Sequence, residues 1–394
     1  MRVLLATQPG SGHWHPLVPL ARALDTAGHE VAFATAPGVC AAVTAQGFRC
    51  HPVGLDESAS ERRSRRDRLM GLPAEAQAVF FWTNVFAGSR AERALPDLLA
   101  LLTDWRPDLL VREDAELASA LAAEHFGIPQ AVVQVTAWRT HLRPLIAPPL
   151  DRLRLTVGLP PDPDLSMFDH SLLLVPGPPG YADLASPLPP TAHLMRPVLF
   201  DHSGEEELPA WVDHLPPTRP TVYATLGTVS NHTPGIIDAI LVGLAAEPIS
   251  LIVTVGRDQD PADFGPQPAH VKVERYIPQS LLFPRVDLVF THGGSGTVMA
   301  AFSHGLPMVI VPIAADQPDN AWRCADLGVA RVIDPADRSP AAFRAAVRAV
   351  LGDPSYRRRA ERLRQAMLEL PGPAETVARL EGFMKRDSFQ DVGV

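Results

Sequence analysis

The chain has 394 residues, a net charge of −9, a hydrophobic fraction of 46% and a charged fraction of 20%. This length exceeds one ordinary domain core, so two domains are expected. The composition is typical of a globular protein and excludes a disordered chain, and the acidic balance disfavours a nucleic-acid partner.

The N-terminal apolar stretch, "RVLLAT", is too short for the hydrophobic region of a secretory signal. No run of about 18 apolar residues occurs, so no membrane-spanning helix is expected. The three cysteines, Cys40, Cys50 and Cys324, are sparse and lack the C-x-x-C spacing. These features predict a cytoplasmic protein with reduced thiols.

The first third of the chain alternates between strand and helix patterns. Apolar runs at 2–7 and 30–35 predict buried parallel strands, and the apolar spacing within 16–28 predicts a helix between them. Residues 8–15 are predicted to be a loop. The same alternation returns at 108–136, which indicates a parallel sheet with helices on both faces.

The middle of the chain is rich in proline from 144 to 220, so helices and central strands are not expected across most of it. Strand and helix patterns resume at 220 and continue almost to the end. The sequence therefore predicts an α/β protein with two Rossmann-like, doubly wound domains facing across a cleft. The expected boundaries are 1–200 for the first domain, 201–217 for a linker, 218–376 for the second domain, and 377–394 for a helix and tail that can pack back on the first.

A cluster of glycines, 293–296, lies between a predicted strand and a predicted helix. The start of a helix has unpaired N–H groups and a partial positive charge, and glycines let an anion approach that backbone. Ser295 and Thr297 add hydroxyl donors, and His292 can donate to a phosphate oxygen. These residues suit a diphosphate, and a plain strand-to-helix turn is the alternative.

Asp316 and Gln317 follow the next predicted strand, so they are expected at the same edge of the sheet. Carboxylate and amide groups suit hydroxyls, which both donate and accept hydrogen bonds. The alternative is a turn, "DQPDN", capped by its Asp and Asn side chains.

The loop "PGSGHWHP" lacks the dinucleotide pattern G-x-G-x-x-G, because His15 occupies the last glycine position. A zinc site is also weakly supported, since no third ligand accompanies His13 and His15. The remaining functional interpretation is a general base, because imidazole titrates near neutral pH. An ordinary surface or core histidine is the alternative.

The segment "THGGSGTVMAAFSHGLPMVIVPIAADQPDNA" resembles the nucleotide-sugar signature of inverting, metal-independent glycosyltransferases of the GT-B fold. It is most similar to the bacterial branch that modifies antibiotics and other natural products. The resemblance implies transfer of a sugar, expected to be a deoxysugar, from a nucleoside diphosphate to a hydroxyl of a small acceptor. TDP is favoured over UDP. The nucleotide sugar is a co-substrate, and no metal or other cofactor is expected.

The resemblance also implies roles for individual residues. The second domain would bind the donor and the first the acceptor. The donor diphosphate would contact His292, Gly293, Gly294, Ser295, Gly296 and Thr297, together with Gly227 and Thr228. The donor sugar would contact Asp316 and Gln317. The nucleobase would contact Tyr276, which stands where many relatives carry Trp, and Ile277 and Gln279.

On the acceptor side, His13 matches the catalytic base of the family pattern G-H-x-x-P. A base of this kind needs an acidic partner on its second ring nitrogen. The family usually places that partner at the end of a later strand, which here reads "LLVRED". Glu113 is favoured and Asp114 is the alternative, and a solvated charge cluster is the non-functional interpretation.

An apolar acceptor pocket is predicted from four aromatic residues, Phe81, Trp82, Phe86 and Trp138. Ordinary helix packing is the alternative for most of them. The basic segment 61–68, "ERRSRRDR", is expected to be a solvated surface, and contact with an anionic acceptor, a partner or a lipid headgroup is the alternative. Two other functions remain open: a sugar-nucleotide epimerase of the same fold, and a non-catalytic helper protein.

Overall fold

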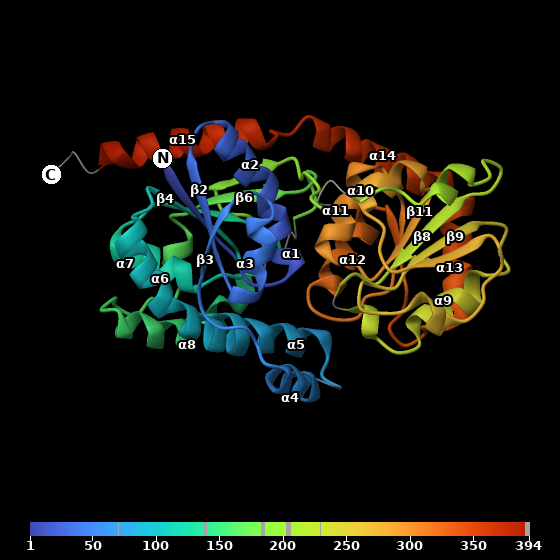
Figure 1. Ribbon diagram of the computed structural model, residues 1–394, viewed down its shortest axis with the longest axis horizontal. Helices are drawn as coiled ribbons and strands as arrows, with labels where there is room; N and C mark the ends of the chain where they lie inside the picture. Colours follow the sequence, from blue (N-terminus) through green and yellow to red (C-terminus); the bar gives the residue numbers. More distant parts are fainter. Residues whose placement is uncertain (70, 138–139, 183–185, 202–205, 229, 391–394) are drawn as a thin grey trace. The chain divides into compact units, whose positions relative to one another are not determined.

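The computed structural model describes residues 1–69, 71–137, 140–182, 186–201, 206–228 and 230–390. The chain divides into two compact units (Figure 1). The first comprises Met1–Pro176, Ala182–Val198 and Leu370–Val394, and the second comprises Gly177–Tyr181 and Leu199–Glu369. Each unit contains a parallel sheet with helices on both faces, so the predicted α/β class with two doubly wound sheets is confirmed.

The sheet of the first unit has the strand order β3-β2-β1-β4-β5-β6-β7. Its strands are β1 (Arg2–Ala6), β2 (Glu30–Thr35), β3 (Arg49–Pro52), β4 (Leu109–Glu113), β5 (Gln130–Val133), β6 (Leu172–Pro176) and β7 (Ala192–Met195). The central strands are buried on both faces, which explains their nearly continuous apolar sequences. All the neighbouring strands pair in parallel.

The helices of the first unit are α1 (Ser11–Trp14), α2 (Val18–Thr26), α3 (Pro37–Thr44), α4 (Ala59–Leu69), α5 (Ala74–Phe80), α6 (Ala91–Trp105), α7 (Ala118–Phe126), α8 (Arg143–Thr156) and α15 (Pro373–Gln390). Shorter turns are η1 (His15–Leu17), η2 (Phe81–Arg90), η3 (Thr140–Leu142) and η4 (Ser166–Phe168). Helices α6, α7 and α8 enclose the main core with η2, and α15 packs on α2 (Figure 1).

The sheet of the second unit has the order β10-β9-β8-β11-β12-β13. Its strands are β8 (Thr221–Thr225), β9 (Ser250–Thr254), β10 (Val271–Glu274), β11 (Leu288–Thr291), β12 (Met308–Ile310) and β13 (Ala330–Val332). Its helices are α9 (Ile236–Leu244), α10 (Gln279–Leu282), α11 (Ser295–Ser303), α12 (Gln317–Asp326), α13 (Pro340–Gly352) and α14 (Pro354–Leu368). The short turns are η5 (Ala210–His214), η6 (Ser230–His232), η7 (Pro261–Phe264) and η8 (Phe283–Arg285).

The proline-rich middle of the chain is more regular than the sequence predicted. Helix α8 contains Pro148 and Pro149 in its interior, and β6 and β7 extend the first sheet. The prediction of little helix or strand between 144 and 220 was therefore wrong for these elements. Burial explains the helix, because Ile146, Leu150 and Leu153 lie on one face and pack into the main core.

Two local predictions in the first unit also need correction. The loop predicted at 8–15 is helical from Ser11, because Gly10 takes a φ of 122° and its carbonyl accepts the N–H of His13 at 3.0 Å. Cys40 and Cys50 form a disulfide that joins α3 to β3, so the prediction of reduced thiols was wrong for this pair. Their Cα atoms lie 5.4 Å apart, within the usual range for a bridge. Cys324 is free and buried.

Candidate active site

One candidate site lies in the first unit, where two neighbouring strands of its sheet end. Strands β1 and β4 pair in parallel with Ala6 opposite Arg112, so both carboxyl ends reach the same edge. The chain leaves β1, turns at Gly10 and enters α1, which carries His13. Glu113 is the last residue of β4. Residues 100 positions apart in sequence are thus brought together by strand register.

His13 and Glu113 are in contact. Nδ1 of His13 lies 3.2 Å from Oε1 of Glu113, and the side chains are 22% and 0% exposed. The ring N–H is not aligned as in a regular hydrogen bond, so the contact is chiefly electrostatic. The carboxylate is fixed on both oxygens, because Oε1 accepts the N–H of Gln8 at 3.1 Å and Oε2 accepts the N–H of Ala115 at 2.6 Å. The buried carboxylate is therefore itself held in one position beside the imidazole.

The surroundings of His13 act on its pKa in opposite directions. Burial lowers the pKa of His13, but the charge and hydrogen-bonding capacity of Glu113 outweigh that effect, and the pKa is raised overall. The charge of Arg90 opposes the shift, and that of Asp114 adds to it. His13 is thus a stronger base than an isolated imidazole.

Asp114 has different partners from Glu113. Its Oδ1 accepts the N–H groups of Val135 at 2.9 Å and Thr136 at 3.2 Å, and its Oδ2 accepts the Thr136 hydroxyl. Burial and the adjacent Glu113 raise the pKa of Asp114 to about 6, although these hydrogen bonds lower it. The geometry therefore places Glu113, not Asp114, against His13, while the orienting role itself stays a prediction.

Arg90 connects the two sides of this arrangement. Its Nη1 donates to Oε1 of Gln8 at 3.0 Å, and Gln8 donates its N–H to Glu113. Its guanidinium also lies 5.8 Å from the ring centre of Phe86, which in turn lies 6.0 Å from the ring centre of His13. Arg90 thus supports Gln8 and Phe86, both of which contact the pair of His13 and Glu113.

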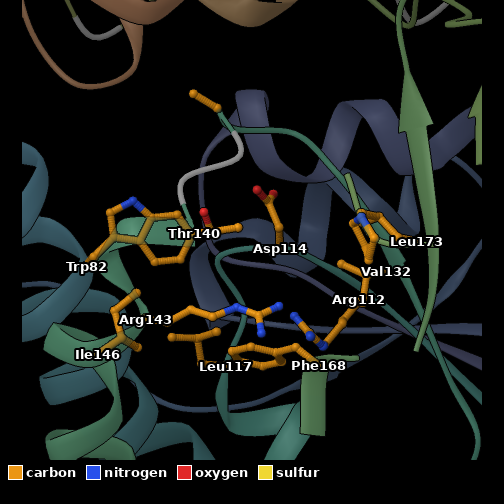
Figure 2. Close-up of a pocket in the computed structure, with 12 residues that line it drawn as sticks. Trp82, Arg112, Asp114, Leu117, Val132, Thr140, Arg143, Ile146, Phe168 and Leu173 are labelled. Carbon is orange, nitrogen blue, oxygen red and sulfur yellow. The ribbon is translucent and has the colours of Figure 1, made fainter. Parts of the chain in front are cut away.

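A small cavity of about 60 Å³ lies beside Asp114 in the first unit (Figure 2). Its walls include Trp82 and Phe168, and two arginines, Arg112 and Arg143, point their guanidinium groups toward one another beside the Phe168 ring. The guanidinium carbons lie 5.0 Å and 6.0 Å from that ring centre. Arg112 is 2% exposed and its Nε lacks a hydrogen-bond partner.

The predicted aromatic residues take different positions. Trp82 lines the small cavity, Phe86 is buried in the main core beside His13, and Phe81 packs against that core. Phe81 and Phe86 thus take part in core packing, whereas Trp82 faces a cavity. Trp138 lies outside the described residues. Their roles in acceptor binding stay predictions.

Another candidate site is the turn between β11 and α11 in the second unit. Gly293 has a φ of 88°, which favours glycine, and Gly294 is the N-cap of α11. A Cβ at Gly294 would lie 2.5 Å from Nε2 of His292, and a Cβ at Gly227 would lie 2.6 Å from Cε1 of the same ring. The two glycines therefore leave space for the imidazole and keep the helix start open to an anion.

His292 is 8% exposed, and burial lowers its pKa to about 4. Its Nδ1 lies 3.3 Å from the Thr291 hydroxyl. The ring is therefore neutral at physiological pH. A neutral imidazole still has one N–H to donate, so His292 is suited to hydrogen bonding rather than to proton transfer.

A hydrogen-bond network fixes the glycine turn to the start of α12. Ser295 donates to Oδ2 of Asp316 at 2.7 Å, and the amide of Asn320 donates to the same oxygen at 3.0 Å and to the carbonyl of Gly293 at 2.9 Å. Ala315 takes a left-handed conformation with a φ of 59°, which turns the chain immediately before Asp316. The network brings Asp316 to the predicted diphosphate turn.

The amide of Gln317 is already engaged within the protein. Its Oε1 accepts the N–H groups of Ile313 at 2.8 Å and Ala314 at 2.9 Å, and its Nε2 donates to Ser230 at 3.2 Å. The residue is 5% exposed. Asp316 is the more accessible of the two predicted sugar ligands.

The predicted nucleobase segment runs into α10. Ile277 is buried, and Gln279 donates to the Thr297 hydroxyl at 3.1 Å. Tyr276 donates its hydroxyl to the carbonyl of Asp201, and the guanidinium of Arg257 lies 3.9 Å from its ring centre. One face of the Tyr276 ring is therefore covered by Arg257.

The other two predicted donor residues, Thr228 and Gly296, are exposed.

Sequence reasoning missed three residues that shape these two candidate sites. Gln8 and Arg90 support Glu113, and Asn320 fixes the glycine turn. Asn320 carried a signal, since it closes the "DQPDN" turn, and its amide donates both to Asp316 within that turn and to the distant carbonyl of Gly293. No local pattern identifies Gln8 or Arg90, because their partners are distant in sequence.

Within the described ranges, no group of three or more His, Cys, Asp or Glu side chains is placed to hold a metal ion. Over the same ranges, no helix has both the length and the apolar character that crossing a bilayer requires.

Comparison with known protein families gives matches in both units. Residues 22–144 match the N-terminal domain of the erythromycin biosynthesis protein CIII-like family, and residues 239–383 match its C-terminal domain. The chain is 30% identical to the 4'-demethylrebeccamycin synthase of Lentzea aerocolonigenes, covering 97% of this chain and 99% of that protein. It is 32% identical to the L-demethylnoviosyl transferase of Streptomyces niveus, covering 95% and 96%.

Solved structures match over nearly the whole chain as well. The glycosyltransferase VinC in complex with DTDP superimposes with a TM-score of 0.81 and 27% identity, covering 98% of this chain and 100% of that one. The Streptomyces sp. SF2575 glycosyltransferase SsfS6, complexed with thymidine diphosphate, gives a TM-score of 0.78 and 26% identity, covering 97% and 99%. The predicted GT-B fold is confirmed by these matches.

Proposed function

The chain belongs to the erythromycin biosynthesis protein CIII-like family of glycosyltransferases, and on that premise we propose that it transfers a deoxysugar from a TDP-sugar to a hydroxyl of a small natural-product acceptor, with inversion. That it is a glycosyltransferase follows from the family. The choice of TDP is supported by the relatives solved with thymidine diphosphate. Deoxysugar transfer is supported by curated relatives such as a 10-deoxymethynolide desosaminyltransferase of Streptomyces venezuelae.

The observation that carries the proposed mechanism is the contact between His13 and the buried Glu113. Glu113 faces Nδ1, so the opposite ring nitrogen, Nε2, is the atom that takes the acceptor proton. Among the described residues no partner of that nitrogen is found. The imidazolium that forms is stabilised by the Glu113 carboxylate, in the manner of a catalytic base with an acidic orienting partner.

The proposed reaction is a single displacement. As His13 removes the proton, the acceptor oxygen bonds to the anomeric carbon of the sugar, and the bond from that carbon to the diphosphate oxygen breaks. The electron pair leaves with TDP. Attack from the face opposite the leaving group inverts the anomeric centre. His13 then releases its proton to solvent.

The departing diphosphate gains negative charge, which the proposal assigns to the turn before α11. The free N–H groups and partial positive charge of the helix start, together with the neutral His292 ring, would stabilise that charge. Gly293 and Gly294 keep side chains away from this backbone. In this proposal, Asp316 and Gln317 contact the sugar, and Tyr276, Ile277 and Gln279 surround the nucleobase.

A screen of TDP-, UDP- and GDP-sugars tests the proposal. We expect TDP to give the largest upward shift in melting temperature, since ligand binding stabilises the folded state. Incubation with TDP-deoxysugars and hydroxylated aromatic or macrolide acceptors should then yield a glycoside and TDP. NMR of the product should show an anomeric configuration opposite to that of the donor. Retention of configuration would contradict the single displacement, and a preference for UDP would contradict the donor assignment.

A further inference from the structure

The first unit contains a second cavity, which is larger than the one beside Asp114. Its volume is about 370 Å³, against about 60 Å³ for the smaller one. Pockets that hold drug-sized molecules are roughly 300 to 1,000 Å³, so only the larger cavity has room for a complete aglycone. It lies among α4, the end of β1, the segment after β3, and η2. Apolar side chains on its wall include Leu55, Phe80 and Val85.

The larger cavity adjoins the predicted base. Gln8 and Arg90 both line it. Gln8 donates its N–H to Glu113, which contacts His13, and Arg90 holds the side chain of Gln8. The larger cavity therefore borders a residue that contacts Glu113, the carboxylate beside His13.

The wall of the larger cavity carries more positively charged side chains than negatively charged ones. Four arginines and three glutamates line it. Arg65 is paired with Glu57, and Arg93 is paired with Glu61. The third glutamate, Glu116, is 4% exposed and its carboxylate accepts the N–H of Ser119 at 2.8 Å.

The two remaining arginines are Arg68 and Arg90. Within the residues that the structure describes, neither forms an ion pair with a carboxylate. Arg68 is exposed, while Arg90 is half-buried and faces the neutral amide of Gln8. These two guanidinium groups thus have no ion-pair partner among the described residues on the wall of a partly apolar cavity, which carries one more arginine than glutamates. Guanidinium groups bind carboxylates through paired N–H donors, so this wall is complementary to an organic acid.

We propose that the larger cavity is the acceptor site and that it selects an acceptor with a flat apolar body and an ionised carboxylate, which Arg68 and Arg90 bind. This inference rests on the proposed function, because it names the acceptor class of the same transferase. It also gives the basic segment 61–68 a role, since α4 carries Arg68 to the cavity wall. The apolar part of the acceptor packs against Phe80 and Val85, and its hydroxyl is then presented to His13.

The test uses equilibrium binding without a donor. The probes are rhein, an anthraquinone with two hydroxyls and one carboxylate, and its primary amide, which has nearly the same shape without the charge. Isothermal titration calorimetry should show that the acid binds about tenfold more tightly than the amide. Arg68→Gln should remove this preference and leave amide binding unchanged. Because Arg68 is exposed, the substitution leaves the core intact.

Arg63→Gln is the matched control. Arg63 lies on the same helix, is also exposed, and does not line the larger cavity. Arg63→Gln and Arg68→Gln change the net charge by the same amount, so a general electrostatic effect would appear in both variants. The acid preference should persist in Arg63→Gln, and added salt should weaken binding of the acid more than of the amide. Equal binding of acid and amide, binding of neither, or equal effects of the two substitutions would overturn the inference.

Failure of this inference can be told apart from failure of the proposed function. TDP affinity and TDP-sugar turnover are measured separately, and Arg68→Gln should change neither the TDP affinity nor the fold. If TDP-sugars are used but acids are not preferred, the inference is wrong and the transferase assignment stands. If the acid binds as expected but no TDP-sugar is bound or used, the donor assignment is wrong instead.

Discussion

Two strand-to-helix turns in this protein each carry a histidine, and their surroundings shift the two pKa values in opposite directions. The turn after β1 begins at a glycine with positive φ and leads to His13, and the turn after β11 has His292 followed by another such glycine. Burial lowers both pKa values, but only His13 has a carboxylate beside it. The pKa of His13 is raised, whereas that of His292 falls to about 4.

This comparison shows that histidines near two strand-to-helix connections can take different chemical roles, although His13 lies within α1 and His292 precedes α11. A histidine beside a buried carboxylate can accept a proton and remain stable as a cation. A buried histidine without such a partner stays neutral and serves as a hydrogen-bond donor. The difference lies in one neighbouring side chain, so substitutions can test it directly.

The largest effect is expected from His13→Ala. Removal of a general base typically costs about 10² to 10⁴ in rate, so we expect a loss of about 10³ in kcat. TDP affinity, measured by calorimetry, should be unchanged because the proposed donor residues lie in the other unit. His15→Ala is the control, since His15 makes an edge-to-face contact with Trp14 and has no assigned role. If His13→Ala kept its turnover, His13 would not be the catalytic base, and the two histidines would not differ in role as proposed.

Gly294→Val should weaken TDP binding by about 10². The backbone at Gly294 suits any residue, with a φ of −65°, so the effect comes from the side chain, which would meet His292. Gly352→Val, at a glycine whose Cβ meets nothing within 4 Å, is the matched control. Calorimetric titration with TDP and thermal unfolding of both variants separate lost binding from lost folding. Unchanged TDP affinity in Gly294→Val would place the diphosphate elsewhere.

His292 should make stability depend on pH. The pKa of His292 is about 4 in the folded protein, against an ordinary value of about 6.5 for an exposed imidazole, so the unfolded chain binds the proton first as pH falls. Above pH ~6.5 His292 does not lower the free energy of unfolding. As pH falls toward ~4, protonation of His292 in the unfolded chain lowers that free energy, by about 2.5 kcal/mol at pH ~4.5. His292→Gln should remove this loss, as measured by guanidinium unfolding at pH ~6.5 and at pH ~4.5. Equal losses in wild type and variant would show that His292 is not buried as a neutral ring.

The smallest effect concerns the acidic partner of His13. The base must be neutral to act, so the rate falls as pH drops through the raised pKa of His13. Glu113→Gln removes the charge that raises this pKa, and the acid limb of the kcat profile should move to lower pH, with a rate loss of about tenfold. Asp114→Asn should move it in the same direction by less, since Asp114 is a weaker contributor. A larger shift in Asp114→Asn would make Asp114 the orienting residue.

The sequence alone determined the features that depend on local patterns. Apolar runs and their spacing predicted the two parallel sheets, because buried parallel strands need continuous apolar sequence. The glycine cluster at 293–296 and the histidines beside both turns were visible in the same way. Proline content was a poor guide for α8, where burial of one face outweighs the lost backbone hydrogen bonds.

Only the tertiary structure decided which groups meet. The register of β1 with β4 brings Glu113 to His13, and the packing of Gly227 and Gly294 around His292 makes room for a buried neutral ring. The juxtaposition of Arg68 and Arg90 also appears only once α4 and η2 line one cavity. The physical reason is common to all three cases: pKa values and binding depend on distances and burial, and residues far apart in sequence set both.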